Sequence, residues 1–398
     1  MNDSNILEDQ PIAWTPTPEV IERARLTQFM KQVGVTTWDE LYAYSINDVE
    51  KFTEEVLKFL DIRFDPPYEK LLDTSGGIEF PKWCEGGGLN ITEMCLDRWQ
   101  TDEMKDQPAV AYEAEDGSNW YKTYEELLID VESVASGLRF NGLGKGDAIA
   151  IHLPMIIETV TALLAIDRIG AIAVPVFSGY GVEAIASRLN AVEAKALFTS
   201  ESYERRGKSV DSLDVAKAAV DRCPTIQKVI CFTSPWSETK FPDDRYLSWN
   251  DLEKYQFLSV NHNEWKNLQF AEHTSAEDPL IILYTSGTTG KPKGIAHTHA
   301  SFPIKAAQDM AFGTDVGKGT RISWYTDIGW MMGPWLIYGA LINGATICIY
   351  DGAPDYPQAD LMWEFCAKHK VEVLGISPTL IRALSNCGDD LPKKHDLS

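Results

Sequence analysis

The chain of 398 residues carries 36 basic and 59 acidic side chains, and a net charge of −23 argues against binding nucleic acid through its phosphates. The seven cysteines are odd in number and none has CxxC spacing, so neither a disulfide framework nor a zinc site is indicated. No stretch is apolar for long enough to span a membrane, and the first residues lack the apolar segment of a secretory signal. We therefore expect a cytoplasmic protein without nucleic-acid or membrane partners.

Residues 1–84 are predicted to form a helical N-terminal extension. Apolar residues recur at helical spacing over 18–33, and Gly34 is placed to end this helix. Thr37 is expected to cap a second helix, and a third should run from about residue 48 to 60. Such an extension either packs against the rest of the chain or binds a partner, and packing is the commoner use.

From residue 108 to 235, short apolar runs alternate with helical patterns. Thr123 and Glu126 have the spacing of a capping box at the start of one helix. Strands are expected at 109–112, 148–152, 172–176, 196–199 and 228–232, and helices at 123–138, 156–170, 182–190 and 215–223. This alternation is typical of a parallel sheet with helices on both faces, and it defines a first α/β subdomain over 85–275.

A second alternation is predicted to begin at Leu280 and to form a second α/β subdomain over 276–398. Its expected strands are 280–283, 321–324, 345–350 and 371–375, with helices at 302–312, 332–342, 361–368 and 379–385. The predicted fold class is therefore α/β, with two adjacent, mostly parallel sheets that are flanked by helices and share a groove. In such sheets ligands bind beyond the carboxyl ends of the strands.

The stretch from Tyr284 to Gly294 follows a buried strand and is rich in hydroxyls and glycines. Successive backbone N–H groups in a tight turn form a nest for anions, and the hydroxyls and lysines add donors and charge. The spacing is not that of a P-loop, because two residues rather than four separate Gly287 from Gly290 and Pro292 follows the lysine. The stretch is either a solvated loop or a polyphosphate site. The candidate phosphate-binding residues are Thr285, Ser286, Gly287, Thr288, Thr289, Gly290, Lys291 and Lys293.

Two further stretches contain residues that suit ligand binding. Between Trp324 and Trp335, tryptophans and methionines alternate with glycines, a pattern of either core packing or the wall of an apolar ligand pocket. The basic cluster at 204–209 is either a solvated loop or an anion contact. His297 and His299 are two residues apart without further ligands at metal spacing, so no metal-binding residues are predicted.

The complete order of the 284–294 stretch resembles the phosphate loop of the AMP-forming acyl-CoA synthetases, within the adenylate-forming superfamily. Residues 89–98 and 327–357 resemble acetyl-CoA synthetases in particular, and the core at 329–335 is similar to plant peroxisomal acyl-activating enzymes. The resemblance implies ATP, Mg²⁺ and CoA as substrates or cosubstrates, a small carboxylate as the acid, and an acyl-adenylate intermediate. For a eukaryotic chain it also implies a peroxisomal location as an alternative to the cytoplasm.

The resemblance also implies roles for individual residues. Strict acetate specificity is not expected, because Met331 and Met332 stand where smaller residues are usual, and a short-chain or related carboxylate is implied. Arg206 replaces a glycine of the family's CoA loop. The implied catalytic residues are Thr288 and Lys293, the implied acyl pocket is Trp330 and Met331, and the implied CoA-binding residues are Arg205, Arg206, Gly207, Lys208, Met332 and Asp355.

The family pattern continues beyond Ser398 with the Mg²⁺ ligands, a ribose-binding aspartate and a mobile lid domain. We therefore expect the chain to be truncated before that C-terminal lid, and to catalyse neither half-reaction alone. Two alternatives stay open: a non-catalytic fragment that binds a nucleotide or CoA, and an adenylate-forming enzyme that transfers to a carrier protein. The oligomeric state is not predicted.

Overall fold

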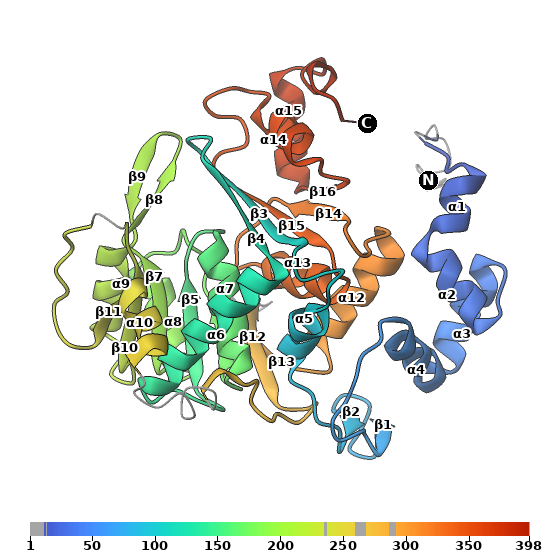
Figure 1. The fold of residues 1–398 in the computed structure, drawn as a ribbon, viewed down its shortest axis with the longest axis horizontal. Coiled ribbons are helices and arrows are strands. Elements are labelled where there is room, and N and C mark those ends of the chain that lie inside the picture. Colours follow the sequence, from blue (N-terminus) through green and yellow to red (C-terminus); the bar gives the residue numbers. More distant parts are fainter. Residues whose placement is uncertain (1–11, 13, 235–236, 259–267, 286–291, 398) are drawn as a thin grey trace, which may run out of the picture.

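The computed structural model describes residues 12, 14–234, 237–258, 268–285 and 292–397, and the side chains of 255–258 are not described. Most strands of this part belong to two sheets that lie side by side (Figure 1). The seven-stranded sheet has the order β11-β10-β7-β5-β6-β12-β13, and the five-stranded sheet has the order β16-β14-β15-β3-β4. All pairs are parallel except β12–β13 and β3–β4, which are antiparallel edge hairpins.

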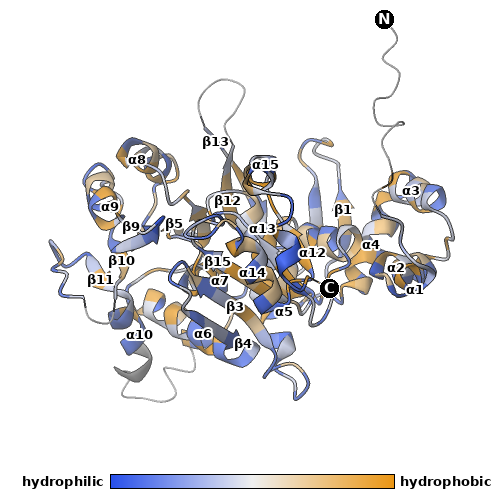
Figure 2. Cartoon of the chain, turned by 90° about the horizontal axis from the view of Figure 1, so that it is seen from above, coloured by the Kyte–Doolittle hydropathy of each residue, from blue (hydrophilic) through white to orange (hydrophobic). Residues whose placement is uncertain are grey.

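The seven-stranded sheet is buried on both faces by helices. Its strands are Ala148–His152 (β5), Ile172–Pro175 (β6), Ala196–Ser200 (β7), Lys228–Phe232 (β10), Tyr246–Ser248 (β11), Pro279–Thr285 (β12) and Lys293–Thr298 (β13). One face packs against Tyr124–Phe140 (α6), Ile157–Arg168 (α7) and Trp249–Leu258 (α10), and the other against Val182–Ala191 (α8) and Leu213–Val220 (α9). In Figure 2, α8 and α9 show both colours, as expected of helices with one face on a sheet.

The five-stranded sheet is also covered on both faces. Its strands are Pro108–Ala114 (β3), Asn119–Thr123 (β4), Arg321–Trp324 (β14), Thr346–Asp351 (β15) and Val373–Gly375 (β16). One face packs against Phe302–Gly313 (α12) and Met332–Ile342 (α13), and the other against Leu361–His369 (α14) and Pro378–Cys387 (α15). Alternate residues of β15 explain this, because Ile347 and Ile349 face the first core while Cys348 and Tyr350 face the second.

The α/β fold class is confirmed, but the expected membership of the two sheets is wrong. We expected the strand at Leu280 to begin the second sheet. Instead, Ile281 of β12 pairs with Ala173 of β6 in the first sheet, and β3 pairs with β15 in the second. The chain therefore crosses between the sheets more than once, because pairing depends on partners far away in sequence. The subdomain boundaries at 84 and 275 stay a prediction.

The N-terminal extension packs against the second half of the chain. It contains Pro18–Arg23 (α1), Arg25–Val33 (α2), Trp38–Asn47 (α3), Val49–Phe59 (α4) and a hairpin of Lys70–Asp73 (β1) and Lys82–Glu85 (β2) that was not predicted. The single helix expected over 18–33 is broken at Ala24. The buried Phe29 ring lies 4.6 Å from the Phe312 ring, and Arg25 Nη2 donates to Asn343 Oδ1 at 3.2 Å. These contacts agree with the expected packing role.

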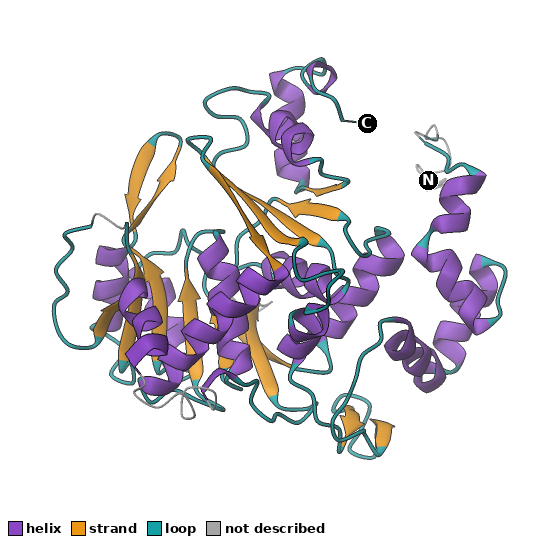
Figure 3. Ribbon diagram, viewed as in Figure 1, coloured by secondary structure: helices purple, strands orange, loops and turns teal. Residues whose placement is uncertain are grey.

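Short elements complete the fold: a buried helix at Ile91–Cys95 (α5), the hairpin of Ser202–Arg205 (β8) and Lys208–Asp211 (β9), and single 3₁₀ turns at Asp97–Trp99 and Pro392–Lys394. The β8–β9 hairpin projects beyond the edge of the seven-stranded sheet (Figure 3). In the part of the chain that is described, no helix combines the length and apolar character needed to cross a bilayer.

Candidate functional site

A cavity of about 830 Å³ lies between the two sheets, beyond the carboxyl ends of their strands. Loops from both sheets line it, which is where ligands bind in open α/β folds. The lining residues come from four segments. After β6 come Phe177, Ser178 and Gly179, and β8 contributes Tyr203 and Arg205. The end of β14 and the segment up to the start of α13 contribute Trp324, Tyr325, Thr326, Asp327, Trp330 and Met332, and after β16 come Ile376, Ser377 and Pro378.

Asp327 joins the loops of the two sheets on the cavity wall. Its carboxylate accepts a hydrogen bond from Ser178 Oγ at 2.6 Å and another from the Gly329 backbone N–H at 2.8 Å. The Ser178 backbone N–H donates to the same group at 3.3 Å. Burial raises the pKa of Asp327 to about 6, although these hydrogen bonds act in the opposite direction. Asp327 therefore holds two loops in contact that are 149 residues apart in sequence.

Two glycines allow this contact. A Cβ at Gly329 would overlap the backbone nitrogen of Phe177, and a Cβ at Gly333 would lie 2.6 Å from the Asp327 carbonyl oxygen. With the backbones this close, the Trp330 ring lies 5.7 Å from the Phe177 ring, and both side chains line the cavity. Glycine at these two positions of the predicted pocket wall is therefore explained by close backbone packing.

Of the predicted acyl and CoA residues in this segment, two line the cavity and one does not. Trp330 and Met332 line the cavity, whereas Met331, although exposed, is not among its lining residues. The resemblance had assigned Met331 to the acyl pocket and Met332 to CoA. The structure therefore brings Trp330 into the expected wall together with Met332, and their roles stay predictions.

The predicted CoA cluster forms a hairpin rather than an irregular loop. Arg205 ends β8 and Lys208 begins β9, with Arg206 and Gly207 at the turn. Both turn residues have positive φ, +54° and +66°, as a two-residue hairpin turn requires. The Arg-Gly pair between two short extended runs is the sequence signal that would have identified this hairpin.

Acidic groups of the five-stranded sheet hold the hairpin. Arg205 pairs with Asp351 at 3.2 Å and Arg206 pairs with Asp355 at 2.7 Å, so two predicted CoA residues contact each other. The Gly207 N–H donates to Glu115 Oε1 at 2.6 Å. Burial raises the pKa of Asp351 to about 6 even though Arg205 lowers it.

Two carboxylates of this group, on Glu115 and Asp351, were not identified from the sequence. Their partners lie on another sheet, and nothing local marks them. Lys208 is exposed and makes no ion pair with any other described residue. The hairpin therefore presents one unpaired lysine beside two paired arginines.

The predicted phosphate loop can be placed only by its stem. Ser286, Gly287, Thr288, Thr289, Gly290 and Lys291 lie outside the described residues. Thr285 ends β12 directly opposite Lys293, which begins β13, and both are exposed. Because β12 runs parallel to β6, its carboxyl end reaches the same sheet edge as Phe177 and Ser178. The stem is therefore on the cavity side of the sheet.

Contacts beside the stem support this placement. The Tyr284 hydroxyl donates to the Arg188 carbonyl oxygen at 3.3 Å, and the Arg188 guanidinium lies 4.3 Å from the Tyr180 ring. The Tyr180 ring in turn packs edge-on against Phe177. A continuous row of side chains thus connects the end of β12 to the cavity wall.

For Mg²⁺, no group of three or more His, Cys, Asp or Glu side chains suited to a metal occurs among the described residues. The two histidines considered from the sequence are a partly exposed His297 and a buried His299, whose Nδ1 accepts from the Ile91 N–H at 3.2 Å. The donor set of this part does not fit a magnesium site, and no chemical step is assigned through the metal.

Comparison with known proteins gives consistent matches over the chain. The family described as "AMP-binding enzyme" matches residues 97–398, and "Acetyl-coenzyme A synthetase N-terminus" matches 38–95. The acetyl-coenzyme A synthetase of Pasteurella multocida is 36% identical over 386 residues, which are 96% of this chain and 56% of that protein. The 3-hydroxypropionyl-coenzyme A synthetase of Sulfurisphaera tokodaii is 33% identical over 391 residues, 94% of this chain and 57% of that protein.

A solved structure, the acetoacetyl-CoA synthetase from Streptomyces lividans, superposes with a TM-score of 0.86 at 29% identity. The superposition covers 96% of this chain and 58% of that one. The chain thus spans somewhat more than half the length of the relatives it matches.

Proposed function

The chain belongs to the AMP-binding enzyme family, as an AMP-forming acyl-CoA synthetase of the adenylate-forming superfamily, and we propose that its protein is an acid–CoA ligase. A carboxylate oxygen attacks the α-phosphorus of ATP, the bond to the bridging oxygen breaks, and pyrophosphate leaves. The CoA sulfur then attacks the acyl carbon of the adenylate, AMP leaves, and the thiol proton passes to solvent. Both steps depend on positioning and charge stabilisation more than on a protein nucleophile.

The observation that carries this proposal is the shared position of two predicted sites. The stem at Thr285 and Lys293 lies at the carboxyl end of β12, which is parallel to β6, and Phe177, which follows β6, packs against Trp330 of the wall. A phosphate loop beside an apolar cavity is the arrangement that an adenylating enzyme needs, because the acid must reach the α-phosphate. Thr288 and Lys293 are proposed to stabilise charge on the phosphates, with the other loop residues as hydrogen-bond donors.

The substrate is proposed to be a short-chain or related small carboxylate. Aromatic side chains and Met332 surround the cavity, and a methionine adapts its shape to different apolar ligands. The relatives are named for acetate, 3-hydroxypropionate and acetoacetate, all small carboxylates. Trp330 is proposed to contact the acyl group.

CoA is proposed to bind at the β8–β9 hairpin. Arg206 is exposed and holds only one carboxylate, Asp355, so a phosphate of CoA can replace that partner at modest cost. Lys208 offers a further charge beside it. Arg205, Gly207 and Met332 complete the proposed CoA contacts.

The decisive experiment measures adenylation and acyl transfer separately in the full-length gene product. Lys293→Ala and Thr288→Ala are expected to lower acid-dependent ATP–pyrophosphate exchange by about 100-fold, the usual cost of one stabilising donor. Lys305→Ala is the matched control, because Lys305 is an exposed lysine of α12 paired only with Asp309, one turn away. Exchange that stays unchanged in Lys293→Ala, with an unchanged melting curve, would contradict the proposal. Replacing CoA by a carrier protein as acceptor distinguishes the ligase from the carrier-linked alternative.

A further inference from the structure

A second cavity, of about 710 Å³, lies apart from the candidate active site and shares no lining residue with it. It is lined by the β3–β4 hairpin, the starts of α6 and α7, the end of β10, and α10. The lining residues are Tyr112, Ala114, Trp120, Tyr121, Lys122, Glu126, Asp130, Ile156, Ile157, Glu158, Thr161, Phe232, Trp249, Asn250 and Glu253. Its volume is within the range of small-molecule sites.

Aromatic rings form much of this cavity's wall. Trp120 stacks on Tyr112 with 5.6 Å between ring centroids, and both Trp120 and Tyr121 are exposed. Trp249 is buried, and its indole N–H donates to Glu253 at 2.8 Å. Exposed rings beside a cavity are favourable surfaces for a cation, because the ring face carries partial negative charge.

The charges around the cavity do not balance. Four carboxylates and one lysine line it. Lys122 pairs with Asp130 at 2.8 Å, and Glu126 accepts from the Thr123 N–H at 2.9 Å in the α6 capping box. Among the described residues, Glu253 accepts a hydrogen bond from the Trp249 indole N–H and forms no ion pair. Three negative charges are therefore left over after the single lysine is counted.

Glu158 is the carboxylate with the least compensation. Among the described residues, no side chain donates a hydrogen bond to it and no cation pairs with it. Burial raises its pKa to about 7 and the neighbouring charges of Asp130 and Glu253 add to the increase, although a backbone N–H in the first turn of α7 and the charge of Lys122 act in the opposite direction. Burial likewise raises the pKa of Asp130 and of Glu253. Desolvation therefore raises the pKa of three of the four carboxylates around this cavity, and one lysine lines it.

We propose that this cavity binds a small organic cation, with its alkylammonium group between Glu158 and Glu253 and its carbon chain against Trp120. The ammonium supplies the charge that Lys122 alone does not, and the aromatic walls accommodate the methylene groups. This binding site does not depend on the proposed ligase activity.

Binding should strengthen as the pH rises from about 6 to 8. Glu158 must lose its proton to pair with the ammonium, and its pKa in the unliganded protein is about 7. The other titratable groups that line the site are Lys122, Glu126, Asp130, Glu253, Tyr112 and Tyr121. An alkylammonium stays charged over this range, because its pKa is about 10.

The test is calorimetric titration of the full-length protein with 1,6-diaminohexane, and with 1,6-hexanediol as the uncharged probe. The diamine should bind with a Kd below about 1 mM at pH 8, and the diol should not bind measurably. Glu158→Gln and Trp120→Ala should each weaken the diamine about tenfold or more. Glu125→Gln is the matched control, because Glu125 is an exposed acid in the same turn as Glu126 but outside the cavity.

Four outcomes would overturn the proposal: no diamine binding to the folded wild-type protein, equal binding of the diol, unchanged binding in Glu158→Gln, or binding of Nα-acetyl-lysinamide alone. The last would assign the cavity to a lysine side chain of a partner. A second measurement avoids dependence on the probe. Without any ligand, Glu158→Gln should raise the melting temperature at pH 8 relative to the wild type, because it removes a negative charge from a group whose pKa is raised in the folded protein.

Discussion

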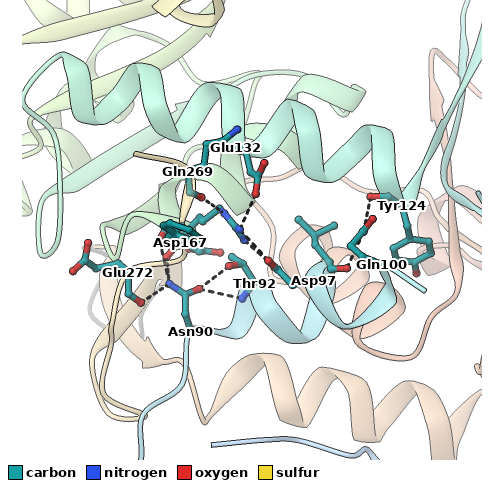
Figure 4. A network of polar contacts seen from close by, with 12 residues as sticks. Asn90, Thr92, Asp97, Gln100, Tyr124, Glu132, Asp167, Gln269 and Glu272 are labelled. Carbon is teal, nitrogen blue, oxygen red and sulfur yellow. Dashed lines mark hydrogen bonds and ion pairs between the residues drawn. The ribbon is translucent and has the colours of Figure 1, made fainter. Parts of the chain in front are cut away.

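Two groups of arginines in this protein show how the same side chain serves stability in one place and is available for binding in another. Arg168, at the end of α7, is only 2% exposed. Its guanidinium pairs with both oxygens of Asp97 at 2.8 and 3.0 Å, with Glu132 at 3.1 Å, and donates from Nε to the Gln269 carbonyl oxygen at 2.7 Å (Figure 4). The amide of Asn90 donates to the Arg168 carbonyl oxygen at 3.2 Å. Three segments that are distant in sequence thus converge on one buried charge.

The arginines of the β8–β9 hairpin have fewer partners and more solvent. The Arg206 side chain is 56% exposed and has one carboxylate partner, and Arg205 is 33% exposed with one. A buried, fully paired arginine cannot exchange its partners without unfolding its surroundings. An exposed pair gains little and can be replaced by another anion. The difference between the two groups therefore separates a structural network from a candidate phosphate site.

The largest expected effect comes from Arg168→Ala. It leaves Asp97 and Glu132 without their shared cation in a partly buried network, and it should destabilise the protein by about 3–5 kcal/mol. The measurement is denaturant unfolding followed by tryptophan fluorescence. Arg206→Ala is the matched control and should cost at most about 1 kcal/mol. Equal losses in the two variants would refute the distinction drawn between them.

A smaller loss of stability is expected from Asp327→Ala, which removes the acceptor that joins the two cavity loops. The Ser178 hydroxyl and the Gly329 N–H lose their partner, at a cost of about 1–3 kcal/mol. In the full-length enzyme, KM for the carboxylate should rise more than kcat falls, because the wall at Trp330 loses its support. If unfolding and kinetics were both unchanged, the loops would be held by other contacts.

The pH dependence of stability tests the same carboxylate. Its pKa is about 6 in the folded protein against 3.8 as the ordinary value, so the folded state binds the proton more tightly than the unfolded state. The contribution of Asp327 to stability is therefore greatest below about pH 4 and is lost as the pH rises to about 6. Asp327→Asn should show a flatter fall in melting temperature over this interval than the wild type. Parallel curves would mean that other groups cause the pH dependence.

The smallest effect sharpens the role of the hairpin. Arg206→Ala is expected to raise KM for CoA several-fold, equivalent to about 1 kcal/mol, with little change in adenylation. Asp355→Asn distinguishes two possible roles of Asp355 itself. If Asp355 only competes with a phosphate for Arg206, KM for CoA falls; if Asp355 itself contacts CoA, KM rises. Neither variant should alter ATP–pyrophosphate exchange, and a change there would place the hairpin in the first half-reaction instead.

Local features of the fold could be predicted well. The predicted cap at Thr37 and the predicted capping box of Thr123 with Glu126 are present, because a cap depends on residues three apart in the chain. The β8–β9 hairpin was missed because the basic cluster at its turn was interpreted as a loop by its charge. The N-terminal helices were predicted, but their contact partner, α12, was not, because helical spacing shows that a face is apolar and not what covers it.

The candidate site was predictable only in part, for the same reason. The resemblance identified Lys293, Trp330 and Arg206 as residues of interest. Trp330 lines the cavity between the sheets, Lys293 begins β13 at the stem, and Arg206 lies at the turn of the β8–β9 hairpin. It did not identify Ser178 or Phe177. Their partners, Asp327 and Trp330, are about 150 residues away, and a single sequence contains no signal for such a pair.

By itself, the sequence determined the alternation of strands and helices, the helix caps, and the acidic balance of the chain. All of these depend on the order of neighbouring residues, on which φ, ψ and hydrogen bonds within one turn depend. Only the tertiary structure decided that β12 joins β6, that Asp327 closes the wall against Ser178, and that four carboxylates surround one aromatic cavity. Those contacts arise when segments far apart in the chain bury a common surface, and burial also sets the pKa values of the acids enclosed there.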